Sequence, residues 1–172
     1  MSNFDLAIMA VDPGLTTGVA QGVFTIGDPS GMVPELLAVG RGMRTFEISN
    51  SEIEEHWEVS AAIEIVKEWR WFRNEWPSCE HRLVLEDWTA RLPLRSAGRV
   101  VLSPARIASC VEGLLANQEI GRAGEIKYQR PADAKTYATD RRLKEWKLWV
   151  KGSDHQRDAN RHLALALLKE TI

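Results

Sequence analysis

The chain has 172 residues, 27% charged and 44% hydrophobic, a composition typical of one globular domain spanning residues 1–172. No apolar run approaches the ~20 residues needed to cross a bilayer, and the N-terminus lacks a basic signal-peptide region, which argues against membrane and secretory classes and predicts a cytoplasmic protein. The net charge of −2 and the pI near 6.1 argue mildly against a nucleic-acid binder, although carboxylates at a site would mask a local basic surface.

The first half of the chain predicts three strands and a long helix. The strands are expected at residues 6–11, 17–26 and 35–46, separated by turns rich in Gly, Pro and Asp. From Ser51 the apolar spacing becomes helical, and Ser51 with Glu54 forms a capping-box pattern that predicts the helix start. Three aromatic residues share one face of this helix, where packing on the sheet is the simpler interpretation and base stacking the alternative: Trp69, Phe72 and Trp76.

The second half alternates strands and helices. Strands are expected at 81–88 and 124–130, with a helix between them that starts at Ser103 as N-cap and Pro104 as first residue. A helical region follows at 131–149, and a final helix begins at Ser153 or Asp154. This order predicts an α/β fold with a five-stranded mixed sheet, three antiparallel-type strands followed by two parallel ones, flanked by helices.

Carboxylates follow two of the apolar strands. Asp12 comes after the first, and Glu86 and Asp87 come after the strand that contains "LVL". If these strands are parallel neighbours, the carboxylates meet at one edge of the sheet. On the last helix, His155 and Asp158 are three residues apart and share a face. A cluster of carboxylates with one imidazole and no thiol favours Mg²⁺ or Mn²⁺ over zinc. The simpler interpretation of Asp12 is a turn residue, since an aspartate at a strand end more often has that role.

Three motifs together resemble a known family. "AVDPGLTTGVA", "LVLED" and "HQRDANRHLALAL" are similar to the motifs of the RuvC-like Holliday-junction resolvases of the RNase H-like superfamily, including phage versions. The resemblance implies an RNase H-like fold, with Asp12, Glu86 and Asp158 as metal ligands and His155 as the fourth active-site residue. It also implies two Mg²⁺ ions, replaceable by Mn²⁺, that hydrolyse branched DNA to 5′-phosphate and 3′-hydroxyl ends. A phage-encoded member would act in the host cytoplasm.

The resemblance further implies a homodimer that cuts two opposed strands. Its candidate interface is the helix at 104–120, whose apolar stripe is broader than one sheet face requires. That stripe consists of Ile107, Cys110, Val111, Leu114 and Leu115. The sequence departs from the family's pattern at one position. The family often carries, three residues beyond the glutamate, an aromatic residue that acts as a wedge to open the junction. Here that position is Thr89, with Trp88 one residue earlier, and the role of Asp154 is also left open.

Two basic segments flank the acidic motifs in sequence. Residues 127–151 hold eight basic and three acidic residues, and the loop at 89–103 is basic with no acid. Phosphate contacts are expected from Arg91, Arg95, Arg99, Lys135, Arg141, Arg142 and Lys144. A solvated basic helix face is the simpler alternative for 141–151.

Three other functions share parts of this pattern. An RNase H-like nuclease acting on RNA or an RNA–DNA hybrid would carry the same carboxylates. A non-catalytic nucleic-acid-binding module of this fold would usually have lost acids that are all present here. Actin-like and sugar-kinase ATPases share the "DPGLTTG" type of turn, but they need two lobes and a far longer chain.

Overall fold

The structure is a computed structural model that describes residues 4–27, 38–50, 56–87, 99–116 and 126–171, with the backbone alone at 38–39, 99–102 and 171. Within these ranges, no helix is long and apolar enough to cross a membrane.

The five predicted strands form one mixed sheet. They are β1 (Phe4–Asp12), β2 (Thr16–Ile26), β3 (Ala38–Ser49), β4 (Glu80–Glu86) and β5 (Ile126–Gln129). The strand order is β3-β2-β1-β4-β5, with β1–β2 and β2–β3 antiparallel and β1–β4 and β4–β5 parallel. This confirms the predicted mixed sheet. The third strand extends to Ser49, three residues beyond its predicted end, and residues 35–37 lie outside the described ranges.

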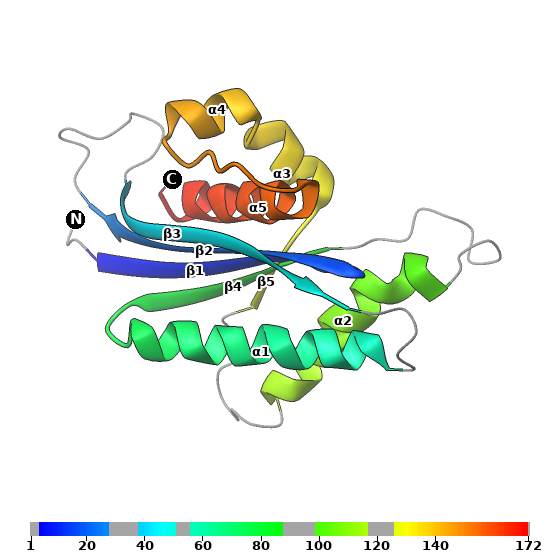
Figure 1. Cartoon of the computed structure of the whole chain (residues 1–172). Helices are drawn as coiled ribbons and strands as arrows, with labels where there is room; N and C mark the ends of the chain where they lie inside the picture. The colour runs from blue at the N-terminus through cyan, green and yellow to red at the C-terminus, as the bar shows by residue number, and fades with distance from the viewer. Residues whose placement is uncertain (1–3, 28–37, 51–55, 88–98, 117–125, 172) are drawn as a thin grey trace.

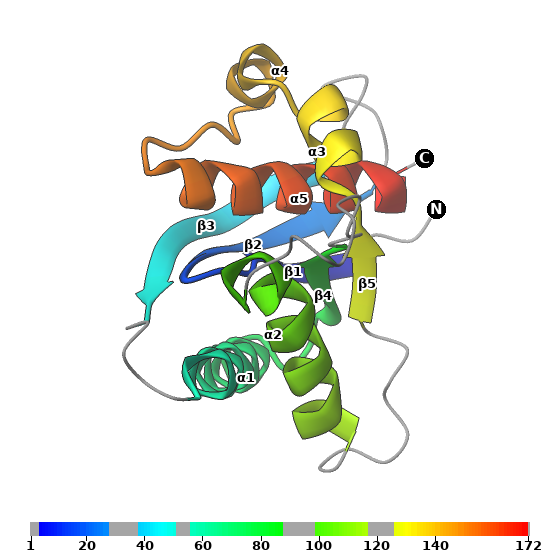
Figure 2. The ribbon, with the colours of Figure 1, turned by 90° about the vertical axis from the view of Figure 1, so that its right-hand side faces the viewer.

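Helices cover both faces of the sheet. On one face lie α1 (Trp57–Glu75) and α2 (Arg99–Ala116). On the other face lies α5 (Asp154–Thr171), together with the short helices α3 (Pro131–Tyr137) and α4 (Asp140–Glu145) that precede it in the chain. Figure 1 shows α5 between the sheet and α4, and Figure 2 shows β3 and β5 at opposite edges of the sheet. Because β1 is central, both of its faces are buried, and its side chains divide between two apolar cores.

Two predicted helix starts are wrong. Helix α1 begins at Trp57, with His56 at the N-cap and no side-chain cap hydrogen bond, so the Ser51–Glu54 pattern is not its cap and lies outside the described residues. Helix α2 begins at Arg99, and Pro104 lies inside it rather than at its first position. A proline inside a helix lacks the N–H of one helical hydrogen bond, and its ring crowds the carbonyl group four residues earlier. The apolar side chains that follow, Ile107 and Val111 among them, are buried in the core and offset this cost.

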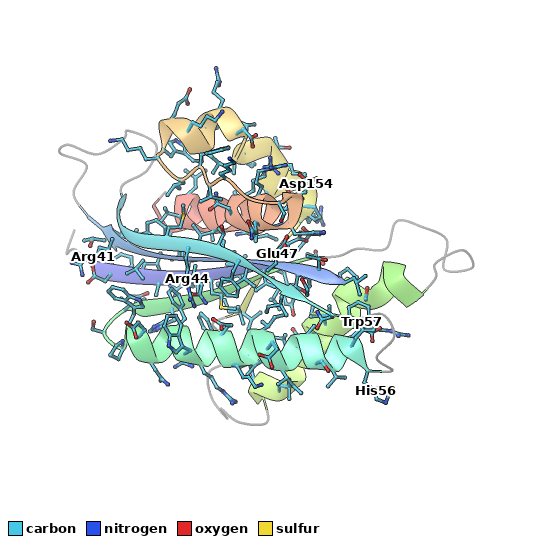
Figure 3. All side chains as sticks on the ribbon, in the orientation of Figure 1. Arg41, Arg44, Glu47, His56, Trp57 and Asp154 are labelled. Atoms are coloured by element: carbon cyan, nitrogen blue, oxygen red, sulfur yellow. The ribbon has the colours of Figure 1, made fainter. Side chains whose placement is uncertain are left out.

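The predicted start of the last helix is confirmed. The Ser153 hydroxyl accepts a hydrogen bond from the Gln156 N–H, and the Gln156 side chain accepts one from the Ser153 N–H, both at 3.2 Å. This reciprocal pair is a capping box, so Ser153 is the N-cap and Asp154 is the first helical residue. The Ser153 hydroxyl also bonds the Glu47 carboxylate on β3, and Figure 3 shows Glu47 close to Asp154 at the start of α5.

The aromatic face of α1 packs on the sheet, as the simpler interpretation predicted. Trp69 and Phe72 are buried in the core on the α1 side, with Trp76 packed against it. Cys79 is buried and Cys110 half-buried, and both are free thiols. The expected dimer stripe on α2 is only partly available. Its inner residues, Ile107 and Val111, are fully buried in the chain's own core.

Gly18 on β2 allows α5 to approach the sheet closely. A Cβ atom at Gly18 would lie 2.1 Å from the carbonyl oxygen of His155 and 2.4 Å from its carbonyl carbon. Atoms of a real side chain essentially never come that close, so this strand position requires glycine. The glycine in "TTGVA" therefore positions the N-terminal turn of α5 directly over the sheet.

Candidate active site

A row of polar residues crosses the sheet at the carboxyl end of β1. The register pairs Asp12 with Gly18, Gly18 with Glu47, and Glu86 with Gln129. The parallel pair Val11 and Leu85 immediately precedes Asp12 and Glu86, which brings these two carboxylates to neighbouring positions. Side chains alternate along a strand, and Ala10 and Val84 pack against α5. Asp12 and Glu86 therefore both face α5.

Helix α5 brings two further predicted residues to this edge. His155 Nδ1 lies 3.1 Å from Asp12 Oδ2. Asp158, one turn further along the helix, forms an ion pair with Lys135 of α3 at 2.9 Å and a second with Arg161. The histidine side chain is half-exposed, whereas the three carboxylates of Asp12, Glu86 and Asp158 are between 12% and 18% exposed.

The pKa of Asp12 is raised from 3.8 to about 6. Burial is the largest cause, and the negative charge of Glu86 adds to it, with a smaller contribution from Asp158. The hydrogen bond and charge of His155 act in the opposite direction. The three carboxylates thus lie close enough to repel one another, which is the condition under which a bound cation stabilises such a cluster.

A lysine ammonium group from α3 faces the same cluster. The pKa of Lys135 is raised, mainly by its hydrogen bond to Asp158 and further by the charges of Glu86 and Asp12, although burial opposes this. Beside it, Arg161 bridges Asp158 to Asp140 of α4 at 2.7 Å. These side chains line a polar pocket of about 520 Å³ next to Asp158, together with Thr139, Asp154 and Arg157. The pocket is open to solvent, and its three positive groups are paired with its three carboxylates.

Two buried polar residues that sequence reasoning missed support Glu86. His162 of α5 is 1% exposed, and its Nε2 lies 3.0 Å from Glu86 Oε2. Its Nδ1 lies 3.2 Å from the side-chain amide of Gln129 on β5. The spacing in the sequence could have identified His162, because it lies one helical turn after Asp158 and therefore on the same face of α5.

The donor set fits a hard divalent cation by its chemistry. Carboxylate oxygens with one imidazole suit Mg²⁺ or Mn²⁺. The raised pKa of Asp12 reflects its burial first and the negative charges of Glu86 and Asp158 second. Among the described residues, no three His, Cys, Asp or Glu side chains are gathered closely enough to hold a metal ion as they stand. Asp158 is instead turned toward Lys135 and Arg161.

The remaining predicted residues lie further from the carboxylates or outside the described ranges. Asp154 is exposed and pairs with Arg157, and the Asp87 N–H extends the pairing of β4 with β5. The predicted phosphate-binding residues on α4 are placed as follows: Arg141 is exposed, Arg142 donates to the Tyr137 carbonyl oxygen, and Lys144 lies over the Trp149 ring. Trp88, Thr89, Arg91 and Arg95 lie outside the described residues, and only the backbone of Arg99 is described.

Comparison of the structure with solved structures gives clear matches. Thermus thermophilus RuvC matches with a TM-score of 0.61 and 14% identity, and T. thermophilus RuvC in complex with a Holliday junction substrate matches with 0.59 and 13%. Each match covers 95% of both chains. The chain has the RuvC-type RNase H-like fold. This confirms the predicted fold over almost the whole chain, whereas no protein-family model and no curated protein sequence matches.

Proposed function

We propose that this protein is a metal-dependent endonuclease that resolves Holliday junctions or related branched DNA. The observation that carries the proposal is the meeting of Asp12, Glu86 and Asp158, from two parallel strands and the last helix, at one edge of a RuvC-type sheet. A matched structure of the same fold is described as a complex with a Holliday junction substrate. A phage origin stays a prediction, as does action in a host cytoplasm.

In this proposal Asp12, Glu86 and Asp158 hold two Mg²⁺ ions, and His155 completes the site or orients the attacking water. The ions, when bound, supply an activated water and stabilise the leaving oxygen of a phosphodiester. The protein contributes three carboxylates, each less than one-fifth exposed, whose mutual repulsion favours cation binding. Lys135 and Arg161, which pair with Asp158 in the structure described here, are available to a DNA phosphate once a cation takes over that carboxylate.

The decisive experiment is cleavage of labelled nucleic acids in the presence of Mg²⁺. Four-way junctions, flaps, duplex DNA and an RNA–DNA hybrid should be compared, with Glu86→Gln as the inactive variant and Glu64→Gln on the exposed face of α1 as its matched control. We expect the wild type and Glu64→Gln to cut four-way junctions and Glu86→Gln not to cut them. Preferential cutting of the hybrid would favour the RNA-directed alternative, and binding without cutting would favour a non-catalytic module.

A homodimer is part of the proposal, because symmetric cutting of a junction needs two sites and one chain supplies one. Val59 and Ile63 of α1 are exposed apolar residues, and α1 packs against α2. A pocket of about 520 Å³ lies between the two helices, lined by Val59 and Cys110 among others. Sedimentation at micromolar concentration, with and without junction DNA, tests this assembly. Val59→Asp should favour the monomer, and a wild-type monomer in both conditions would indicate a nicking enzyme.

A further inference from the structure

His162 is a buried histidine that the proposed reaction does not use. It lies in the middle of α5 at 1% exposure, and its ring connects Glu86 of β4 to Gln129 of β5. A buried ring nitrogen needs a hydrogen-bond partner, and here both nitrogens have one. The ring therefore has a defined orientation between two strands, at the same edge of the sheet as the carboxylate cluster.

Gln129 determines which ring nitrogen carries the proton. The amide orientation that satisfies all its atoms has the Gln129 nitrogen donating to the His162 carbonyl oxygen at 3.1 Å and to His162 Nδ1 at 3.2 Å. The Gln129 oxygen then accepts from the Ala166 N–H at 3.2 Å. Because Nδ1 accepts, the ring proton is on Nε2, and Nε2 donates to Glu86 Oε2.

This contact restricts the Glu86 carboxylate. With Oε2 held by a buried donor, the carboxylate cannot rotate without leaving the His162 N–H unsatisfied inside the protein, which is unfavourable. Oε1 is therefore the oxygen that this contact leaves fully available to a cation, whereas Oε2 keeps one lone pair. Gln129 is itself fixed, because its backbone oxygen accepts from the Asp87 N–H at 2.7 Å and its side chain contacts α5.

We propose that His162 is a positioning residue that fixes the orientation of the Glu86 carboxylate for divalent-cation binding, with Gln129 selecting the tautomer that donates to it. The proposal rests on the proposed function for the identity of the cation. Hydrogen-bond partners of a ligating carboxylate typically change metal affinity or activity by about 10- to 100-fold when removed.

The test compares Mn²⁺ binding by wild type and variants, measured by electron paramagnetic resonance of free Mn²⁺. His162→Leu keeps the bulk but removes the donor, and His162→Gln restores an N–H at a similar reach. Asn160→Leu is the matched control, because Asn160 is equally buried on the same helix and donates instead to the Leu148 carbonyl oxygen at 2.8 Å. Urea unfolding of each variant reports its stability separately.

We expect His162→Leu to weaken Mn²⁺ binding by about 10- to 100-fold and His162→Gln to stay within about threefold of wild type. Asn160→Leu should lose stability but keep its Mn²⁺ affinity. In the wild type, ¹⁵N NMR of the histidine rings should assign the proton of His162 to Nε2. Unchanged Mn²⁺ affinity in His162→Leu, no recovery in His162→Gln, or a proton on Nδ1 would each overturn the proposal.

If the proposed nuclease function is wrong, the measurements would differ from those expected if only the role of His162 is wrong. The wild type itself would then neither bind Mn²⁺ nor cut any nucleic acid, whatever stands at position 162. The tautomer of His162 would still be measurable in the wild type and would decide whether the positioning contact exists. If His162→Leu fails to fold, His162→Gln and the NMR measurement still decide the proposal.

Discussion

Replacing Asp12 with asparagine should stabilise the metal-free protein while abolishing cleavage. Folding raises the pKa of this carboxyl from 3.8 to about 6, because burial and the charge of Glu86 disfavour its ionised form. At about 1.36 kcal/mol per pH unit between the two values, the ionised carboxylate destabilises the folded state by roughly 3 kcal/mol. Asparagine removes this charge but weakens the contact with His155, so we expect a net gain of about 1–3 kcal/mol near neutral pH.

The gain in folding stability of Asp12→Asn over the wild type should depend on pH. A raised pKa means that the folded protein binds the proton more tightly, so this stabilisation is complete below pH 3.8 and is lost as the pH rises through about 6. The advantage of Asp12→Asn should therefore appear above pH ~6 and vanish below pH ~4. Urea unfolding in EDTA across this range measures it.

A control variant separates this effect from general surface changes. Asp5→Asn removes a carboxylate of the same strand that accepts hydrogen bonds from Thr25 and Arg41, and it should not gain stability. Adding Mg²⁺ should stabilise the wild type more than Asp12→Asn, because a ligand that binds only the folded state adds to its stability. An Asp12→Asn protein that is less stable than wild type at neutral pH in EDTA, or that still cuts junctions, would refute the reasoning.

Three further perturbations test other parts of the site. His155→Ala should reduce cleavage far more than Asp154→Ala, because only His155 contacts Asp12, and the reverse ranking in a cleavage assay would contradict this. Gly18→Ala should destabilise the fold by about 1–3 kcal/mol in urea and displace the start of α5, whereas Gly42→Ala, with no atom within 4 Å of its Cβ, should not. Lys135→Ala should weaken junction affinity and reduce the slope of log affinity against log salt by about 0.9, and an unchanged slope would mean that this lysine makes no phosphate contact.

The sequence by itself determined the order of the elements and which strands end in acidic residues. The continuous apolar run before Asp12 predicts a strand buried on both faces, and β1 is central in the sheet. The Ser153–Gln156 capping box starts α5 where the sequence predicts. These signals act over a few residues, so periodicity and spacing are sufficient to read them.

A local signal can also predict a helix start wrongly. Pro104 follows Ser103 in a pattern typical of a helix start, yet α2 begins at Arg99. The packing of Ile107 and Val111 against the sheet stabilises the helix, and this tertiary contribution outweighs the local preference of one proline.

Only the tertiary structure decided which side chains surround the carboxylates. Glu86 and His162 are 76 residues apart in the chain, and their contact depends on the rotation of α5 about its axis and its height above the sheet. That placement follows from the close approach of α5 at Gly18 and from the apolar contacts along the same helix. The sequence therefore predicts which strands end in acids, whereas the packing of α5 determines which groups contact those acids.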